Sequence, residues 1–275
     1  MKKREQKPPF PWTSLGVLIF VALLLLAIVT AYTRGEKKRL IENASKEIEA
    51  VANLKSDQIE RWRKEKINDA RLIYENRTLV EQIESFFISE DNRREKFLLT
   101  QYLTSIIQIY DFGSALLLDA GGGPGLSVPP EASAMGVSLR NRITSVIAKP
   151  EIELSGIHQA SAVSYPHLDL VIPMRMPHQG DTVLTGLIIL RINPDKELFP
   201  LFNTWPTPSN TSECLLLSRE GDSVTFINKL RHTDNAPLEM RFSVNDPLLP
   251  AAEAAKGFQG IMTGIDYRGE RVVAA

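Results

Sequence analysis

The sequence has a single cysteine, Cys214, which excludes an intrachain disulfide framework and a metal site built from cysteine pairs. The residues that follow it, Leu215–Leu217, are apolar, so we expect the thiol to be a small buried side chain, with interchain pairing as the alternative. An excess of charge is also missing, because the net charge is −1 and basic residues are scattered among acidic ones. Binding of nucleic acid is therefore not expected.

Motifs of the common hydrolases and nucleotide-binding enzymes are absent too. The sequence has no Gly-x-Ser-x-Gly elbow and no Ser-x-x-Lys pair. The run Gly121–Gly125 lacks the Gly-Lys-Ser/Thr ending of a phosphate loop and leads into an apolar run, which predicts a hairpin turn. Asp111-Phe112-Gly113 spells the metal-binding triplet of kinases without the other kinase motifs. We therefore expect no catalytic residues in this chain and leave open whether the whole protein is an enzyme.

The histidines do not have the spacing of a metal site. His158, His167, His178 and His232 include no His-x-x-x-His pair and no His-Glu-x-x-His helix, which would place two imidazoles on one helix face. The sequence thus predicts neither a metal site nor a cofactor.

A long uncharged run near the start, Leu15–Tyr32, is the strongest positive signal. It has 18 residues without a charge, and the uncharged stretch extends from Pro8 to Thr33. A helix of about 20 residues crosses a ~30 Å hydrocarbon core. A cleavable signal peptide has a shorter apolar core, usually ~7–15 residues, and an Ala-x-Ala-like site after it. We therefore expect an uncleaved transmembrane helix in a lipid bilayer, in preference to a signal peptide or a buried core helix.

The charges on the two sides of this run do not decide its orientation. Basic residues number four before it and four after it: Lys2, Lys3, Arg4 and Lys7, then Arg34, Lys37, Lys38 and Arg39. The positive-inside rule gives no answer for such a tie, and long domains can be translocated regardless of charge. An extracytoplasmic position for residues 35–275 is therefore allowed, with residues 1–14 in the cytoplasm.

Residues 35–74 have the pattern of one long amphipathic helix. From Glu36 to Tyr74 there is no proline, and apolar residues recur at spacings of three, four or seven, while charged residues fill the other face. The apolar stripe needs a partner. The segment is predicted to be a stalk that packs on its own domain, that forms a homodimer with a second copy, or both.

Residues 75–202 change from helical to strand periodicity. Two helical patches, around Leu79–Ile88 and Lys96–Ile109, are followed by short apolar runs and one further helix, Ser138–Ala148. The predicted strands are Ser114–Asp119, Gly125–Val128, Glu153–Gln159, Leu168–Met174 and Val183–Ile192. This order predicts an α+β domain with an antiparallel sheet.

Residues 203–275 begin a second unit. A linker rich in Pro, Ser and Thr, Asn203–Ser212, precedes a hairpin made by Cys214–Ser218 and Ser223–Ile227. A short helix, Leu248–Lys256, and two more strands, Gly260–Asp266 and Arg271–Ala275, follow. We expect a second antiparallel-sheet domain that is incomplete in this chain.

One set of polar residues could bind a ligand. Asp169 lies on the apolar strand Leu168–Met174, Tyr165 and His167 precede it, and Arg175 follows it, with Tyr110 and Asp119 flanking the first strand. A carboxylate on a sheet, opposite aromatic and basic groups, can bind a zwitterion or another polar molecule by charge-assisted hydrogen bonds. The candidate ligand residues are Asp169, Tyr165 and Arg175. The ordinary alternative is that strand alternation directs some of them to solvent.

Two segments resemble a known family. Residues 53–65 (NLKSDQIERWRKE), continuing to Asp69-Ala70, resemble the "LK-x-x-QI-x-x-W-x-x-E…DA" segment in the stalk helix of many sensor histidine kinases. Residues 264–275 (GIDYRGERVVAA) resemble the "DYRG-x-x-V-x-A" hairpin of their membrane-proximal domain. With the architecture, this makes residues 10–275 similar to the double Cache extracytoplasmic sensor module of bacterial membrane receptors.

The resemblance implies two tandem PAS-like Cache domains outside the inner membrane, of which the distal one binds a small molecule. The implied output is a histidine kinase, with a diguanylate cyclase or a chemoreceptor as alternatives. The Arg-x-Trp-Tyr signature of the amino-acid-binding subset is absent, although Asp169 lies on a strand comparable to the one that supplies the ligand aspartate there. Alternatives from other classes are a membrane-anchored cell-envelope enzyme and a scaffold that dimerises through residues 36–74 without a ligand.

Overall fold

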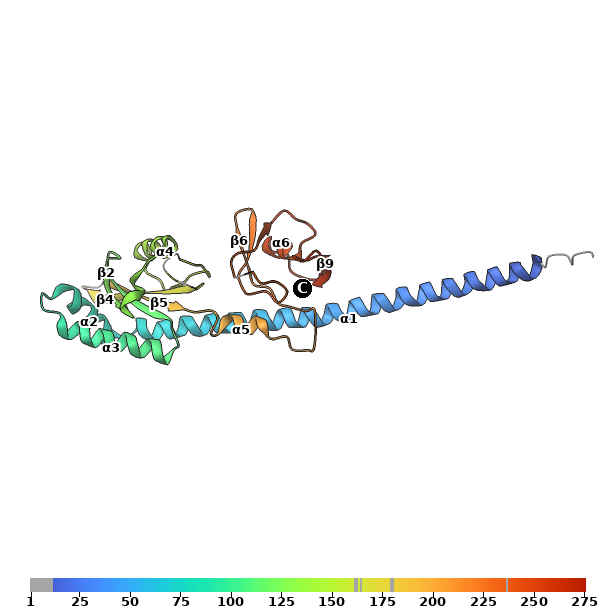
Figure 1. Ribbon diagram of the computed structural model, residues 1–275. Helices are drawn as coiled ribbons and strands as arrows, with labels where there is room; N and C mark the ends of the chain where they lie inside the picture. The colour runs from blue at the N-terminus through green and yellow to red at the C-terminus, as the bar shows by residue number, and fades with distance from the viewer. Residues whose placement is uncertain (1–11, 161–162, 164, 179–180, 236) are drawn as a thin grey trace, which may run out of the picture.

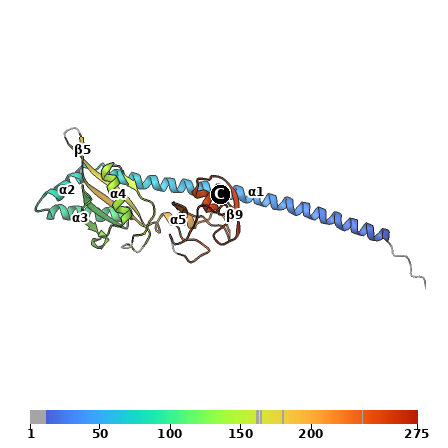
Figure 2. The same cartoon turned by 90° about the horizontal axis from the view of Figure 1, so that it is seen from above.

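A single helix, α1 (Trp12–Tyr74), organises the whole chain. In the computed structural model, which describes residues 12–160, 163, 165–178, 181–235 and 237–275, this helix has 63 residues and no break. At ~1.5 Å rise per residue it is about 95 Å long. Both folded units lie along its C-terminal part, and its N-terminal part projects beyond them (Figures 1 and 2). The predicted span and stalk are thus parts of one continuous helix that passes through Gly35.

The part of α1 from Gly16 to Tyr32 is apolar and exposed. Its most apolar 18-residue window has a mean hydropathy of 2.5 with none of its residues buried. Side chains such as Leu18 and Phe20 are each 67% exposed. Among the described residues, α1 is the one helix that is long and apolar enough to cross a membrane. Apolar side chains exposed on all sides of a helix need a lipid or protein partner.

The first unit, residues 75–202, is built on a five-stranded antiparallel sheet in the order β2-β1-β5-β4-β3. Its strands are β1 (Ser114–Asp119), β2 (Pro124–Val128), β3 (Glu153–Leu154), β4 (Leu168–His178) and β5 (Asp181–Ile192). Its helices are α2 (Arg77–Ile88), α3 (Arg93–Ile109), the short 3-10 helix η1 (Pro130–Ser133) and α4 (Val137–Ala148). The predicted α+β class and antiparallel sheet are confirmed.

Helices cover both faces of this sheet (Figure 1). Leu117, Leu170 and Ile188 face a core formed with α1, α2 and α3, whereas Leu116 and Ile189 face Ile143 and its neighbours on α4. Alternate residues of each strand therefore enter different cores. Burial on two faces explains why the central strands are continuous apolar runs in the sequence.

The third predicted strand is shorter than expected. It was predicted over Glu153–Gln159, but β3 ends at Leu154. The backbone N–H of Ser155 still donates to the oxygen of Asp169 at 2.9 Å, and an isolated bridge follows between His158 and His167. The backbone N–H of Asp169 donates to the side-chain Oγ of Ser155 at 2.7 Å. A hydroxyl thus takes the place of a backbone carbonyl and interrupts the ladder.

The second unit, residues 203–275, contains two small sheets around its own core. One sheet has the order β6-β7-β8, and a separate hairpin pairs β9 with β10. The strands are β6 (Leu217–Glu220), β7 (Ser223–Phe226), β8 (Arg241–Ser243), β9 (Met262–Ile265) and β10 (Arg271–Ala274), and the helix is α6 (Pro250–Ala255). The predicted hairpins and helix are present with shifted ends, and β8 was not predicted. Helix α5 (Leu198–Asn203) joins the two units.

The C-terminal half of α1 packs on both units. Trp62 is 8% exposed and belongs, with Ala70 and Ile73, to the core of the first unit. Lys55 is buried as well, and its Nζ donates to the backbone oxygen of Leu201 in α5. Strand β10 of the second unit lies against α1 (Figure 1). The sequence pattern's prediction of a stalk that packs on its own domain is borne out.

Candidate ligand-binding site

Asp169 is a buried carboxylate at the centre of a polar cluster in the first unit. It lies on β4 directly opposite Arg191 of β5, and both side chains are at most 2% exposed. The Nε of Arg191 donates to Oδ1 of Asp169 at 3.3 Å. A buried carboxylate needs such a partner, because desolvation of an unpaired charge is very unfavourable.

The loop before α4 fixes the guanidinium of Arg191. Its Nη1 donates to the backbone oxygen of Ala132 at 2.9 Å, and its Nη2 donates to that of Ala134. The arginine is thereby held in one plane, and it orients the carboxylate so that the second oxygen, Oδ2, is free for other contacts.

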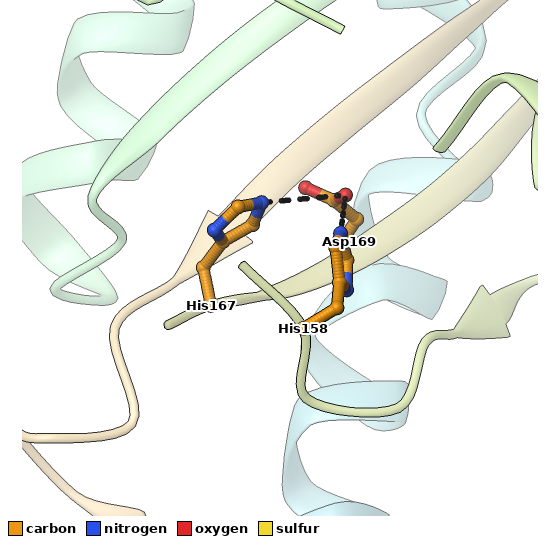
Figure 3. Close-up of side chains that lie close together, drawn as sticks. All are labelled: His158, His167 and Asp169. Atoms are coloured by element: carbon orange, nitrogen blue, oxygen red, sulfur yellow. Dashed lines mark ion pairs between the residues drawn. The ribbon is translucent and has the colours of Figure 1, made fainter. Parts of the chain in front are cut away.

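Two histidines approach that second oxygen. The Nε2 of His158 lies 3.2 Å from Oδ2 of Asp169, and the Nε2 of His167 lies 3.9 Å from the same atom (Figure 3). An isolated bridge outside the named strands sets this arrangement, since the backbones of His158 and His167 exchange hydrogen bonds of 3.0 and 2.8 Å. The two ring centroids are 4.5 Å apart.

The other ring nitrogens face backbone carbonyls. Nδ1 of His158 lies 3.0 Å from the oxygen of Gly156, and Nδ1 of His167 lies 3.2 Å from the oxygen of Tyr165. A carbonyl only accepts, so each Nδ1 carries a proton in this arrangement. The Nε2 of both rings and the Oδ2 of Asp169 are buried and form no hydrogen bond of good geometry.

Burial and charge separate the two histidines. The contact with Asp169 raises the pKa of His158 above its ordinary value, although burial acts in the opposite direction. Burial lowers the pKa of His167, and the Asp169 charge offsets this only in part. His158 is therefore the ring more easily protonated. The cluster presents a carboxylate oxygen and two imidazoles to one point, which can bind a cationic group or a metal ion.

The three predicted ligand residues are not placed together. Asp169 is at the centre of the cluster, and Tyr165 lies beside it. The backbone carbonyl of Tyr165 faces Nδ1 of His167, and the ring centroids of these two residues are 6.2 Å apart. Arg175 is six residues further along β4, about 20 Å away at ~3.3 Å per residue. Its Nη2 donates to the backbone oxygen of Thr182 at 3.3 Å.

The residues of the wider constellation have other contacts. Asp119 accepts hydrogen bonds from the backbone N–H groups of Gly121 and Gly123, at 2.8 and 2.7 Å. These bonds stabilise the predicted hairpin turn between β1 and β2. Tyr110 ends α3, where its N–H donates to Ile106.

Sequence reasoning missed His158 and Arg191. Arg191 stands inside the apolar run Leu187–Ile192, and a charge in such a run is a signal for a buried partner. His158 has no comparable signal in the sequence, because it is nine residues from His167 and does not have the spacing that places two imidazoles on one helix face. The sheet brings His158 and His167 together by strand pairing instead.

A cavity lies away from this cluster, at the junction of the linker and the second unit. It has a volume of about 590 Å³ and is lined by residues that include Phe202, Trp205, Glu213, Cys214 and Arg231. Cys214 is partly buried there, and burial raises the pKa of its thiol.

No protein-family model and no curated protein matches the chain. Solved structures similar to it include the sensory domain of the Campylobacter jejuni chemoreceptor Tlp3 with isoleucine bound, at 13% identity over 61% of this chain and 64% of that one, with a TM-score of 0.42. Another is the ligand-binding domain of the Pseudomonas aeruginosa amino-acid chemoreceptor PctC with GABA, at 15% identity over 80% and 88% and a TM-score of 0.47. A third is the sensor domain of the V. cholerae histidine kinase DctB, at 12% identity over 72% and 89% and a TM-score of 0.39.

The chain spans less than two thirds of the length of the Tlp3 sensory domain. These structures are sensor or ligand-binding domains of chemoreceptors and of a histidine kinase.

Proposed function

We propose that the chain is the ligand-sensing extracytoplasmic region of a bacterial inner-membrane receptor, with residues 15–32 as its membrane span. Residues 75–202 form the membrane-distal sensor domain in this proposal, and residues 203–275 belong to the membrane-proximal one. A histidine kinase is the first choice for the output, and a chemoreceptor or a diguanylate cyclase is the alternative. The observation that carries the proposal is the unbroken α1 helix, which leads from an exposed apolar segment into the core of the first unit.

The position of the Asp169 cluster supports a sensing role. Asp169 lies on β4, and its neighbours Leu168 and Leu170, on the other face of that strand, belong to the core that contains α1. A ligand that binds one arrangement of the cluster more tightly would change how β4 meets α1. The coupling between such sites is typically ~1–3 kcal/mol, and it cannot exceed the difference in the ligand's affinity for the two states.

The part of the stalk between the apolar segment and Val51 supports pairing with a second copy of the chain. Between the apolar segment and Val51, the first buried residue of α1, Leu40 is 66% exposed and Ile41 is 38% exposed. Apolar residues three, four and seven apart on an uncovered helix suit a two-helix contact. We therefore propose a homodimer through residues 35–74.

A topology experiment tests the location. Alkaline phosphatase fused after Pro206 is expected to be active, because residues beyond the span would lie outside the cytoplasm. A fusion at the same site to a reporter that works only in the cytoplasm serves as the control. Activity of the cytoplasmic reporter alone would reject the receptor topology.

A binding experiment tests the sensing role. The full chain in detergent is screened by thermal shift against amino acids, amines, dicarboxylates and divalent metal ions. A ligand at ~100 times its dissociation constant stabilises the folded state by about 2.7 kcal/mol. Asp169→Asn is expected to remove that shift, whereas Arg175→Gln, at the far end of β4, should retain it. A shift that survives Asp169→Asn would move the site away from this cluster.

A further inference from the structure

We propose that His158, His167 and Asp169 form a binding site for one divalent transition-metal ion, with Zn²⁺ as the representative ion. The claim that the metal ion is the sensed ligand rests on the proposed receptor function. The claim that the cluster binds a metal ion depends only on its side chains, and it can be tested without any signalling output.

The donor atoms have the separations that a metal ion requires. One atom from each of the three residues can be chosen so that all lie within 4.8 Å of one another. The two Nε2 atoms are 3.2 and 3.9 Å from Oδ2 of Asp169. In a tetrahedral zinc site with bonds of about 2.1 Å, donor atoms are about 3.4 Å apart. Small side-chain rotations would therefore bring all three donors to bonding distance.

The hydrogen bonds of the cluster leave too few protons for the three acceptor atoms that meet at Oδ2 of Asp169. Both Nδ1 atoms face carbonyls and carry their hydrogens, so a neutral ring directs the lone pair of its Nε2 at Asp169. Three lone pairs then meet at a buried position. One extra proton on His158 can satisfy the contact of 3.2 Å, but Nε2 of His167, at 3.9 Å, still has no partner. A single metal ion between the three atoms would satisfy all of them.

The surrounding contacts are those of an oriented metal site. Protein ligands are usually held by a second layer of hydrogen bonds, in which a histidine donates its other ring N–H to a carbonyl or carboxylate. Here the carbonyls of Gly156 and Tyr165 orient the two rings. Arg191 donates a hydrogen bond to Oδ1 of Asp169, so that Oδ2 is directed at the histidines. All three candidate ligands are therefore oriented without a metal.

The charges and donor types indicate the class of ion. Arg191 balances the charge of Asp169, and the nearby Arg142 is paired with Glu153 at 3.0 Å, so the site has little net charge of its own. Hard ions such as Mg²⁺ and Ca²⁺ need several oxygen donors. Two imidazoles and one carboxylate suit Zn²⁺, Ni²⁺, Cu²⁺ or Fe²⁺ instead. Three protein ligands leave a fourth coordination position for water or a small ligand.

The test measures metal binding directly. The full chain is purified in detergent without a polyhistidine tag, stripped with a chelator, and titrated with ZnCl₂ by calorimetry and with CoCl₂ by visible absorption. We expect one Zn²⁺ per chain and ligand-field bands from Co²⁺ that Zn²⁺ abolishes. His158→Gln and His167→Gln should each weaken binding at least ~100-fold, more than the 10–100-fold typical of lost outer-layer partners.

His178→Gln is the matched control, because His178 is an exposed histidine at the other end of β4. It should bind as the unmodified chain does. His158 is the decisive position, since its side chain is 18% exposed and its replacement is compatible with folding, which circular dichroism would check. Absence of stoichiometric binding, unchanged binding by a folded His158→Gln chain, or equal affinity for Mg²⁺ would overturn the proposal.

The outcome is distinct from that of the proposed function. If no metal binds but an organic ligand gives a thermal shift that depends on Asp169, the receptor proposal stands and the metal site is rejected. If metal binds but the cytoplasmic reporter alone is active, the metal site stands and the receptor topology is rejected.

Discussion

Trp62 in the stalk and Glu197 at the start of α5 are joined by a hydrogen bond, in which the indole Nε1 donates to Oε2 at 2.9 Å. Lys66, one helical turn further on, places its Nζ 2.7 Å from the same oxygen. Glu197 follows β5, the strand that carries Arg191, and precedes the linker to the second unit. The carboxylate of Glu197 thus ties the stalk to the segment between β5 and the linker to the second unit.

Replacement of Trp62 should show how much the stalk depends on this contact. Trp62→Ala is expected to lower the free energy of unfolding by ~3–5 kcal/mol, because it leaves a cavity in the core. Trp62→Phe should cost about 1–1.5 kcal/mol, mainly through the lost hydrogen bond. The measurement is urea unfolding of the full chain in detergent. Arg63→Ala, at an exposed neighbour, is the control and should change stability by less than ~0.5 kcal/mol. An equally small change for Trp62→Ala would contradict the packing.

Replacing Lys66 and replacing Glu197 should have unequal effects on stability. The side chain of Lys66 is 8% exposed and that of Glu197 is 38% exposed. Glu197→Gln removes the ion-pair partner of a buried ammonium, whose remaining acidic neighbour is Asp69, and should destabilise by about 1–3 kcal/mol, which allows for solvent around the carboxylate. Lys66→Met leaves only a half-exposed carboxylate and should change stability by less than about 1 kcal/mol. Unfolding of the two variants under one condition compares them, and the reverse order of effects would show that Lys66 is solvated.

Local patterns predicted much of this architecture. Strand β1 begins and ends where predicted, at Ser114 and Asp119, because its apolar run is bounded by glycines on both sides. The burial of Trp62 followed from the spacing of apolar residues along one helix. Asp169 was identified because a carboxylate among Leu170, Val171 and Ile172 needs a partner.

The rest depends on pairing between distant strands, which no local pattern contains. Arg191 meets Asp169 only because β4 and β5 are in register, and His158 meets His167 only through an isolated bridge. Arg175 follows the predicted strand that carries Asp169, and because β4 continues through it to His178, the two residues lie about 20 Å apart at ~3.3 Å per residue.

Gly186 should not tolerate a side chain. A Cβ at this position would lie 2.8 Å from the backbone oxygen of Leu118 and 3.0 Å from a methyl carbon of Ile83. Because the first of these is backbone, Gly186→Ala would force β1 and β5 apart, and we expect a loss of about 1–3 kcal/mol. Gly35→Ala is the matched control: its Cβ would meet nothing within 4 Å, and alanine in a helix is favoured by up to ~1 kcal/mol. Thermal unfolding measures both, and a neutral Gly186→Ala would show that the sheet adjusts freely.

Asp266 should make the stability of the second unit depend on pH. Its carboxylate accepts from the backbone N–H of Arg268 at 2.8 Å, from Nε of Arg268 at 2.7 Å and from the N–H of Glu270 at 3.1 Å. Burial alone would raise the pKa of Asp266, but these hydrogen bonds outweigh it and lower the pKa below its ordinary value. The carboxylate is therefore more readily ionised in the folded state than in the unfolded state.

The sign of the effect follows from this difference. The stabilisation is fully present above the unfolded pKa, near ~3.9, and is lost as the pH falls through the lower folded pKa. Asp266→Asn should therefore destabilise by about 1–2 kcal/mol near neutral pH, because the hydrogen bonds lose their charge. The difference between the variant and the unmodified chain should shrink as the pH approaches about 3. Urea unfolding across that range, with the exposed Asp222→Asn as control, provides the measurement. A difference that stays constant from neutral to acidic pH would mean that the charge of Asp266 does not stabilise the turn between β9 and β10.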